Sequence, residues 1–339
     1  MSICLCNLSA DSVLELIAQN KLEVTPATPD LSSFSADPVM AGEWLGPIAD
    51  LLPKPIELLV DDARKRRSAA GIVSHVWRGA LPKDGILALD EDIYVTSPEF
   101  TLMQQSTQLH QAALCQMLGR YLGTWTPAKD APNGQGERTP LTTFDSLNEC
   151  LVRAGAVRGS QNLKLAMAYT CEGAASAPET SLQLALSLPP EFHGLGLMLP
   201  TMNYELDLSA GARRLYQRNS IRIDLCWRDA LFGLEYQGKE HGNQLGDDYA
   251  RWFAARMEGY ELWYVAQEQL ESAVQMRHIG REVAKRIGLD VKKMAWPTEG
   301  ELQDLLDILA GRKHPKPVGR TELRRRHMEL KARRGADAK

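Results

Sequence analysis

Two short segments of alternating polarity lie between Ile221 and His241. Apolar side chains occupy every second position from Ile221 to Trp227, and again from Phe232 to Tyr236. Alternation with a period of two is typical of half-buried strands. The residues between the segments, 228–231, suit a tight connection, so the pattern predicts a β-hairpin.

The predicted hairpin brings two acidic side chains together. With Trp227 opposite Phe232, Asp224 lies directly opposite Glu235, with Cβ atoms about 5 Å apart on one face. Like charges so placed repel unless a cation or a shared proton lies between them. Oxygen ligands with room for water are typical of Mg²⁺ sites. The prediction depends on the register, and the alternative is a pair of exposed carboxylates on a solvated sheet face.

The pattern of apolar and polar residues in the rest of the chain predicts a mixture of helices, strands and loops. Helices are expected at 9–20 (capped by Ser9 or Asp11), 55–67, 97–123, 143–153, 160–170, 267–287 and after Thr298. Strands are expected at 71–77, 86–96 and 260–265, and loops at 24–38 and 127–140.

Length and composition are those of an ordinary globular protein. The 339 residues suffice for about two domains, with 44% hydrophobic and 24% charged residues. Without a run of about 18 apolar residues, no membrane span is expected. The first residues lack the basic and apolar regions of a signal peptide. The six cysteines show no paired metal spacing, which favours reduced thiols and a cytoplasmic location.

Charge is distributed unevenly along the chain. The net charge is −4, but 312–339 holds eleven Lys/Arg and three acidic residues, a local +8, so the remainder carries −4 − 8 = −12. Nucleic-acid phosphates are candidate partners of Arg324, Arg325 and Arg326 in this basic tail. The alternative is a solvated tail. The basic run at 64–67 has the same two interpretations, as a solvated helix end or a nucleic-acid contact.

The segments around the hairpin resemble a known nuclease superfamily. An acidic residue on one strand followed by Glu-x-Gln on the next resembles the PD-(D/E)xK superfamily, and the tryptophan and histidine nearby resemble its Vsr-like short endonuclease branch. The opening helix of that branch resembles the segment from Ser176, SAPETSLQLAL. Its later helix, glycine and strand resemble the segment from Asp247, DDYARWFAARMEGYELWYV. HVWRGALP, from His75, and YVTSPEFTLMQQ, from Tyr94, resemble the N-terminal half of actinobacterial relatives that share features with AbiEi-type antitoxins.

The resemblance implies an α/β fold with a restriction-endonuclease-like core, a mixed sheet flanked by helices, preceded by an α+β N-terminal domain. We expect an N-terminal recognition or partner-binding region at 1–170, the nuclease domain at 171–290, and a helix with the basic tail at 291–339.

The resemblance also implies a metal site. Glu179, Asp224 and Glu235 would hold Mg²⁺ or Mn²⁺. Glu179 has a structural alternative, because Ser176-Ala-Pro-Glu179 fits a helix capping box in which the glutamate reaches back to the N–H of the cap residue.

The remaining candidate residues follow the second strand. Gln237 stands where the superfamily most often has lysine; it can position water but brings no positive charge. Lys239, two residues on, could supply that charge, and His241 could act as an acid or base or contact phosphate. Arg251 would either point at phosphate or form a surface pair with Asp248.

These residues predict Mg²⁺-dependent hydrolysis of phosphodiester bonds, with DNA the favoured substrate, in defence or repair. The alternative is a non-catalytic, antitoxin-like or regulatory DNA-binding protein that retains a degenerate nuclease domain. The N-terminal half could bind a protein partner, and the oligomeric state is left open.

Overall fold

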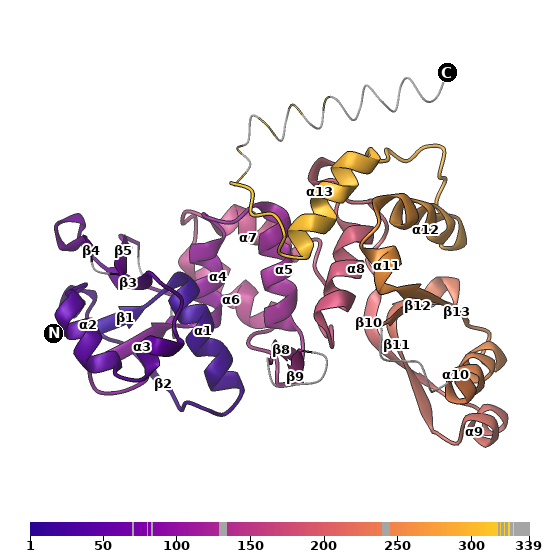
Figure 1. Cartoon of the computed structure of the whole chain (residues 1–339), viewed down its shortest axis with the longest axis horizontal. Helices are drawn as coiled ribbons and strands as arrows, with labels where there is room; N and C mark the ends of the chain where they lie inside the picture. The colour runs from indigo at the N-terminus through magenta and orange to yellow at the C-terminus, as the bar shows by residue number, and fades with distance from the viewer. Residues whose placement is uncertain are drawn as a thin grey trace. The chain divides into compact units, whose positions relative to one another are not determined.

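A computed structural model describes residues 1–69, 71–79, 81–82, 84–128, 134–238 and 245–317, together with 319, 322, 325 and 328. The contacts divide the chain into two compact units. Unit 1 comprises 1–108 and 138–164, and unit 2 comprises 109–137 and 165–339. The segment 109–137 therefore belongs by its contacts to the C-terminal unit (Figure 1).

Unit 1 is built on a seven-stranded mixed sheet with the order β2-β6-β7-β1-β3-β5-β4. β1 pairs parallel with β7, and β3 with β5, while the other neighbours are antiparallel. The strands are β1 (Ile3–Leu5), β2 (Thr25–Ala27), β3 (Ile56–Val60), β4 (Ser68–Ala69), β5 (Ile72–Val76), β6 (Ile86–Ala88) and β7 (Ile93–Thr96).

Both faces of this sheet are buried. Ile3 and Leu5 of β1 belong to one apolar cluster and Cys4 to another, because successive side chains of a strand point to opposite faces. α1 contacts β3, β7 and α4, and α4 contacts α6. The helices of unit 1 are α1 (Asn7–Ala18), α2 (Pro38–Leu45), α3 (Ile48–Leu51), α4 (Pro98–Gln105) and α6 (Phe144–Ala154), and α7 (Ser160–Met167) spans the boundary between the units.

The helix predicted at 55–67 is wrong. This segment forms the interior strand β3, followed by a short 3-10 turn, Ala63–Lys65. β3 lies between β1 and β5 in the sheet, and its Ile56, Leu58 and Val60 are buried in one apolar cluster. A short apolar run is compatible with either a strand or a buried helix, and only its neighbours in the sheet decide which one forms.

Other boundaries in the N-terminal half also differ from expectation. α1 begins at Asn7 with no side-chain cap, and Ser9 instead accepts a hydrogen bond from the Glu57 N–H at 2.9 Å. The loop predicted at 24–38 contains β2. The single helix predicted at 97–123 is two helices, because the second, α5 (Gln111–Leu122), begins at its own cap, His110. The start of the predicted segment is right, since Ser97 caps α4 by accepting from the Phe100 N–H.

Unit 2 contains a four-stranded mixed sheet with the order β10-β11-β12-β13. β10 (Thr201–Asp207), β11 (Ser220–Trp227) and β12 (Phe232–Gln237) are antiparallel neighbours, and β13 (Glu261–Ala266) runs parallel to β12. Strands β8 (Trp125–Pro127) and β9 (Gln135–Glu137) form a separate ribbon, and β9 lies within the loop predicted at 127–140.

Helices flank this sheet. α8 contacts β11 and β12, while α10 contacts β13 and α9 (Figure 1). The helix predicted at 267–287 is broken after Glu271, where Ser272 caps the second piece. Besides α5, the helices are α8 (Ala177–Ser187), α9 (Ala210–Tyr216), α10 (Leu245–Met257), α11 (Gln267–Leu270), α12 (Ala273–Arg286) and α13 (Glu299–Leu309).

The described part of the chain is thus a mixed α/β structure in which a mixed sheet is flanked by helices. All six cysteines are free thiols. Among the described helices, none combines the length and apolar character that crossing a membrane requires.

Candidate functional site

The predicted hairpin and its register are confirmed. Leu225 pairs with Leu234, and Trp227 pairs with Phe232. The connection runs from 228 to 231 and ends at Leu231, whose φ of 48° lies in the left-handed region. Asp224 and Glu235 lie one step beyond Leu225 and Leu234, the last pair of this ladder. There the Tyr236 N–H donates to Asp224 Oδ2 at 2.8 Å, which fixes the Asp224 carboxylate beside β12.

A glycine allows the strands to pack this closely. A Cβ atom at Gly233 would lie 2.5 Å from Ile223 Cγ2 and 2.9 Å from Leu262 Cδ2, closer than real Cβ contacts come. The apolar side chains of β11 and β13 therefore fill the space beside Gly233, two residues before Glu235.

Glu235 is buried rather than solvated, with 4% of its surface exposed. Arg251, from α10, donates from Nη2 to both carboxylate oxygens of Glu235 at 2.7 Å, and also to the Arg222 carbonyl. The side chain of Asp248, the partner considered for Arg251 from the sequence, lies outside the described residues. The arginine compensates the charge of the buried carboxylate. Without it, the uncompensated charge would destabilise the folded state by about 3–5 kcal/mol.

Glu179 caps its helix and also faces the acidic pair. Its N–H donates to Ser176 Oγ at 3.2 Å, and its carboxylate accepts from Ser176 Oγ at 2.8 Å and from the Ala175 N–H at 2.9 Å. The carboxylate thus reaches the N–H of Ala175 rather than that of the cap residue. Its charge nevertheless raises the pKa of both Asp224 and Glu235, so α8 brings a third carboxylate to the pair.

Burial and mutual repulsion govern the protonation of the pair. Desolvation, followed by the charge of Glu179, raises the pKa of Asp224 from 3.8 to about 7. Desolvation and the charge of Asp224 raise the pKa of Glu235 well above its usual range, against the opposing charge of Arg251. Because Arg251 contacts both oxygens of Glu235, we assign the negative charge to Glu235 and the proton that the pair takes up first to Asp224.

Asn203, on β10, was not singled out from the sequence. Its Nδ2 donates to Glu179 Oε2 at 2.7 Å and to the Gly173 carbonyl at 2.8 Å, and its φ of 48° is unusual within a strand. Its Oδ1 is buried and has no partner among the described residues. A buried acceptor without a donor is uncommon and is suited to a cation or a water molecule. In the sequence, the only indication of this role is an asparagine within a segment that has the pattern of a strand.

The structure describes only some of the other predicted site residues. Gln237 ends β12 and pairs with Ala266 of β13. Lys239 and His241 lie outside the described residues, as do Arg324 and Arg326. Arg325 forms an ion pair with Glu322 at 2.6 Å. Arg222, on β11, is exposed two residues before Asp224, and its positive charge lowers the pKa of Asp224.

The oxygen atoms of this acidic set are of the kind that a hard cation binds, but they are not arranged as a set of metal ligands. Within the described ranges, no three Asp, Glu, His or Cys side chains are grouped as metal ligands. Glu179 and Glu235 are engaged by hydrogen bonds, and no described residue donates to Asp224 Oδ1. The orphaned Asn203 Oδ1 and the excess of buried carboxylates over cations fit a divalent ion. Binding would require Glu235 to turn from Arg251.

Comparison of the chain with models of known protein families, with curated proteins and with solved structures gives no match.

Proposed function

We propose that unit 2 is a divalent-metal-dependent nuclease domain that hydrolyses phosphodiester bonds in DNA. The observation that carries the proposal is the set of buried Glu179, buried Glu235 and half-buried Asp224, contributed by three different elements and balanced by one bonded arginine. Burying repelling carboxylates lowers stability, so they are expected to serve a ligand.

The order of elements supports this proposal. An opening helix with its glutamate, a hairpin with two acidic residues, a later helix and a parallel strand follow one another as α8, β11–β12, α10 and β13. This is the order that the resemblance to the PD-(D/E)xK superfamily implies. We therefore propose that the sheet of unit 2 is a restriction-endonuclease-like core, although a fold does not by itself fix a function.

Mg²⁺ or Mn²⁺ is the proposed cofactor, held by Asp224 and Glu235, with Glu179 supporting the site. When bound, the cation would polarise the scissile phosphate and make water more acidic. Asp224 would bind it as the anion, releasing its proton, and Glu235 would turn from Arg251 to reach it.

The residues around the acidic set have proposed roles as well. Gln237 would orient the attacking water through its amide, and Arg222, exposed and two residues before Asp224, would contact a phosphate of the substrate. Lys239, His241 and the basic tail remain predicted contributors. We place the protein in the cytoplasm, acting on foreign or damaged DNA.

The test combines cleavage with cation binding. Purified protein should nick or cut DNA with Mg²⁺ or Mn²⁺ and be silent in EDTA, and Glu235→Ala should abolish cleavage. Mg²⁺ should also raise the melting temperature of the wild type and hardly change that of Asp224→Asn, because a ligand stabilises only a state that binds it. Cleavage that persists in EDTA would contradict a metal-dependent mechanism.

A regulatory role is the second candidate, and two observations favour it. Glu235 is fully engaged by Arg251, and glutamine stands at 237 in place of the usual lysine. In that case the protein would bind DNA without cleaving it, and Mg²⁺ would leave its melting temperature unchanged.

A further inference from the structure

A cavity of about 700 Å³ lies within unit 1, and its volume is that of a small-molecule site. Leu59 and His75, partners on β3 and β5, line it on one sheet face, and Trp77 continues the same face. The remaining walls come from the first residue of α1, the end of α4 and the loop after α6.

Three arginines line this cavity, and no aspartate or glutamate does. Arg66, Arg78 and Arg158 are exposed, and none forms an ion pair with a residue that the structure describes. Glu57 reaches His75 from the neighbouring strand at 3.1 Å but is not a lining residue. The cavity therefore presents a surplus of positive charge, which suits an anionic ligand.

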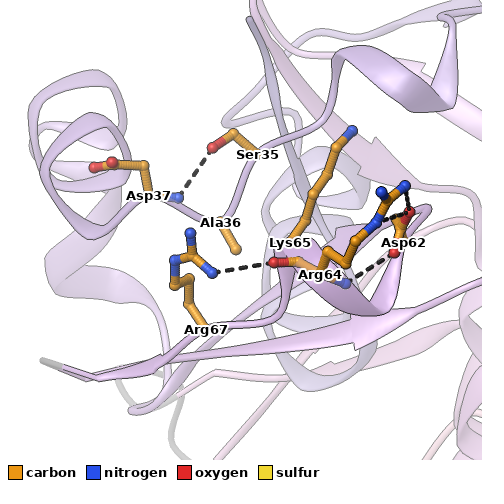
Figure 2. A pocket seen from close by; sticks show the side chains of 7 residues that line it. All are labelled: Ser35, Ala36, Asp37, Asp62, Arg64, Lys65 and Arg67. Atoms are coloured by element: carbon orange, nitrogen blue, oxygen red, sulfur yellow. Dashed lines mark hydrogen bonds and ion pairs between the residues drawn. The ribbon is translucent and has the colours of Figure 1, made fainter.

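A neighbouring cavity shows the contrast. It measures about 340 Å³ and holds the other three members of the basic run, Arg64, Lys65 and Arg67 (Figure 2). These cations are already engaged: Arg64 donates to Asp62 at 2.9 Å, Lys65 pairs with Asp61 at 2.7 Å, and Arg67 donates to main-chain carbonyls, including that of Arg64 at 3.3 Å. The turn at 64–67 thus directs only Arg66 to the larger cavity.

The larger cavity also carries groups that suit a base. Trp77 is half-buried, and its ring is held edge-on against Phe100 with centroids 4.7 Å apart. Gln108 donates to Asn7 Oδ1 at 2.9 Å, and Gln104 is a third amide in the lining. Aromatic rings stack on bases, and amides read their hydrogen-bonding edges.

We propose that this cavity binds one nucleotide, with its phosphate on Arg66, Arg78 and Arg158 and its base against Trp77. A cavity of this size takes a single unpaired nucleotide, so the source is either single-stranded nucleic acid or a free nucleotide. The proposal stands independently of the nuclease activity, because the cavity lies in unit 1 and the acidic set in unit 2.

Binding is to be measured in EDTA with the Asp224→Asn chain, so that cleavage plays no part. The probes are a labelled single-stranded 12-mer, read by anisotropy, and deoxyadenosine monophosphate, read by calorimetry. Arg66→Gln and Arg158→Gln should each weaken binding by roughly fivefold. Each should also reduce the slope of log K against log salt for the 12-mer by about 0.7. Trp77→Leu should weaken it by about tenfold or more.

Arg153→Gln is the matched control, since Arg153 is exposed in the same unit, lies near Arg158 in sequence, and already pairs with Glu149 at 3.5 Å. It should leave binding unchanged. Competition by the mononucleotide would assign the site to free nucleotides, and binding of the 12-mer alone would assign it to single strands. If Arg66→Gln and Arg158→Gln match the control, or if poly-glutamate competes as well as the 12-mer, the cavity is not a nucleotide site.

Discussion

Arg251 donates from one nitrogen to both carboxylate oxygens of Glu235, each at 2.7 Å. This bond links α10 to β12 at the centre of the acidic set. It balances the charge of Glu235, and it leaves Asp224 as the carboxyl that takes up a proton as the pH falls through about 7. Stability and cation binding in unit 2 should therefore respond in opposite directions to changes at these positions.

Arg251→Gln should lower the free energy of unfolding by about 3 kcal/mol at pH 8, because it leaves Glu235 buried without its cation. The loss should shrink toward pH 5, where Glu235 can take up a proton, since its pKa is already raised. Urea unfolding at the two pH values measures both quantities.

Arg286→Gln is the control for this prediction. Arg286 pairs with Glu261 nearer the surface, and loss of such a pair should cost less than about 1 kcal/mol. The double variant Glu235→Gln/Arg251→Gln should be more stable than Arg251→Gln alone at pH 8. Equal stabilities of the single and double variants would show that Glu235 carries no charge for Arg251 to balance.

Asp224→Asn should stabilise the metal-free protein at alkaline pH. The pKa of Asp224 is raised from 3.8 to about 7, so the folded state holds this proton more tightly than the unfolded state does. The stability linked to that proton is present below about pH 4 and is lost as the pH rises toward 7. Asparagine removes this loss, keeps the shape, and can still accept from the Tyr236 N–H.

The expected gain is about 1–3 kcal/mol at pH 8, falling as the pH approaches 5. Thermal melts of both proteins in EDTA, at fixed salt, across pH 5–8.5 measure it. A variant that melts at the wild-type temperature throughout this range would mean that Asp224 ionises as freely as an exposed aspartate.

Gly233→Ala should destabilise unit 2 by about 1–3 kcal/mol, because the added methyl would collide with Ile223 and Leu262. Gly300→Ala is its matched control. Gly300 lies in α13 with open space around it, so alanine should be neutral or stabilising there by up to about 1 kcal/mol. Chemical denaturation of the two variants compares them directly, and similar effects would argue against close packing at Gly233.

Removal of residues 314–339 should weaken DNA binding and flatten its dependence on salt, by about 0.9 in slope for each duplex phosphate that the tail neutralises. Arg312 and Lys313 are kept, because they pair with Asp307 and Asp304 on α13. The deleted segment holds 11 − 2 = 9 Lys/Arg against three acidic residues. Identical binding by the truncated chain at every ionic strength would identify a solvated tail.

The sequence by itself determined the hairpin and its register. Alternation from Ile221 to Trp227 and from Phe232 to Tyr236, together with the length of the connection, set Trp227 against Phe232 and so placed Asp224 beside Glu235. Helix caps can be recognised from the sequence in the same way. The side chains of Ser97, Ser176 and Thr298 each accept a hydrogen bond from the N–H of the residue three positions later. These features depend on neighbours in the chain, and a single sequence records such neighbours directly.

Only the tertiary structure decided what surrounds the acidic pair and which apolar runs become strands. Ile56–Val60 is a strand because β1 and β5 flank it, and nothing within the segment excludes a helix. Arg251 reaches Glu235 across 16 residues, and Asn203 reaches Glu179 across 24, so neither contact follows from local spacing. Burial converts an exposed acidic face into one with raised pKa values, and burial depends on how distant segments pack together.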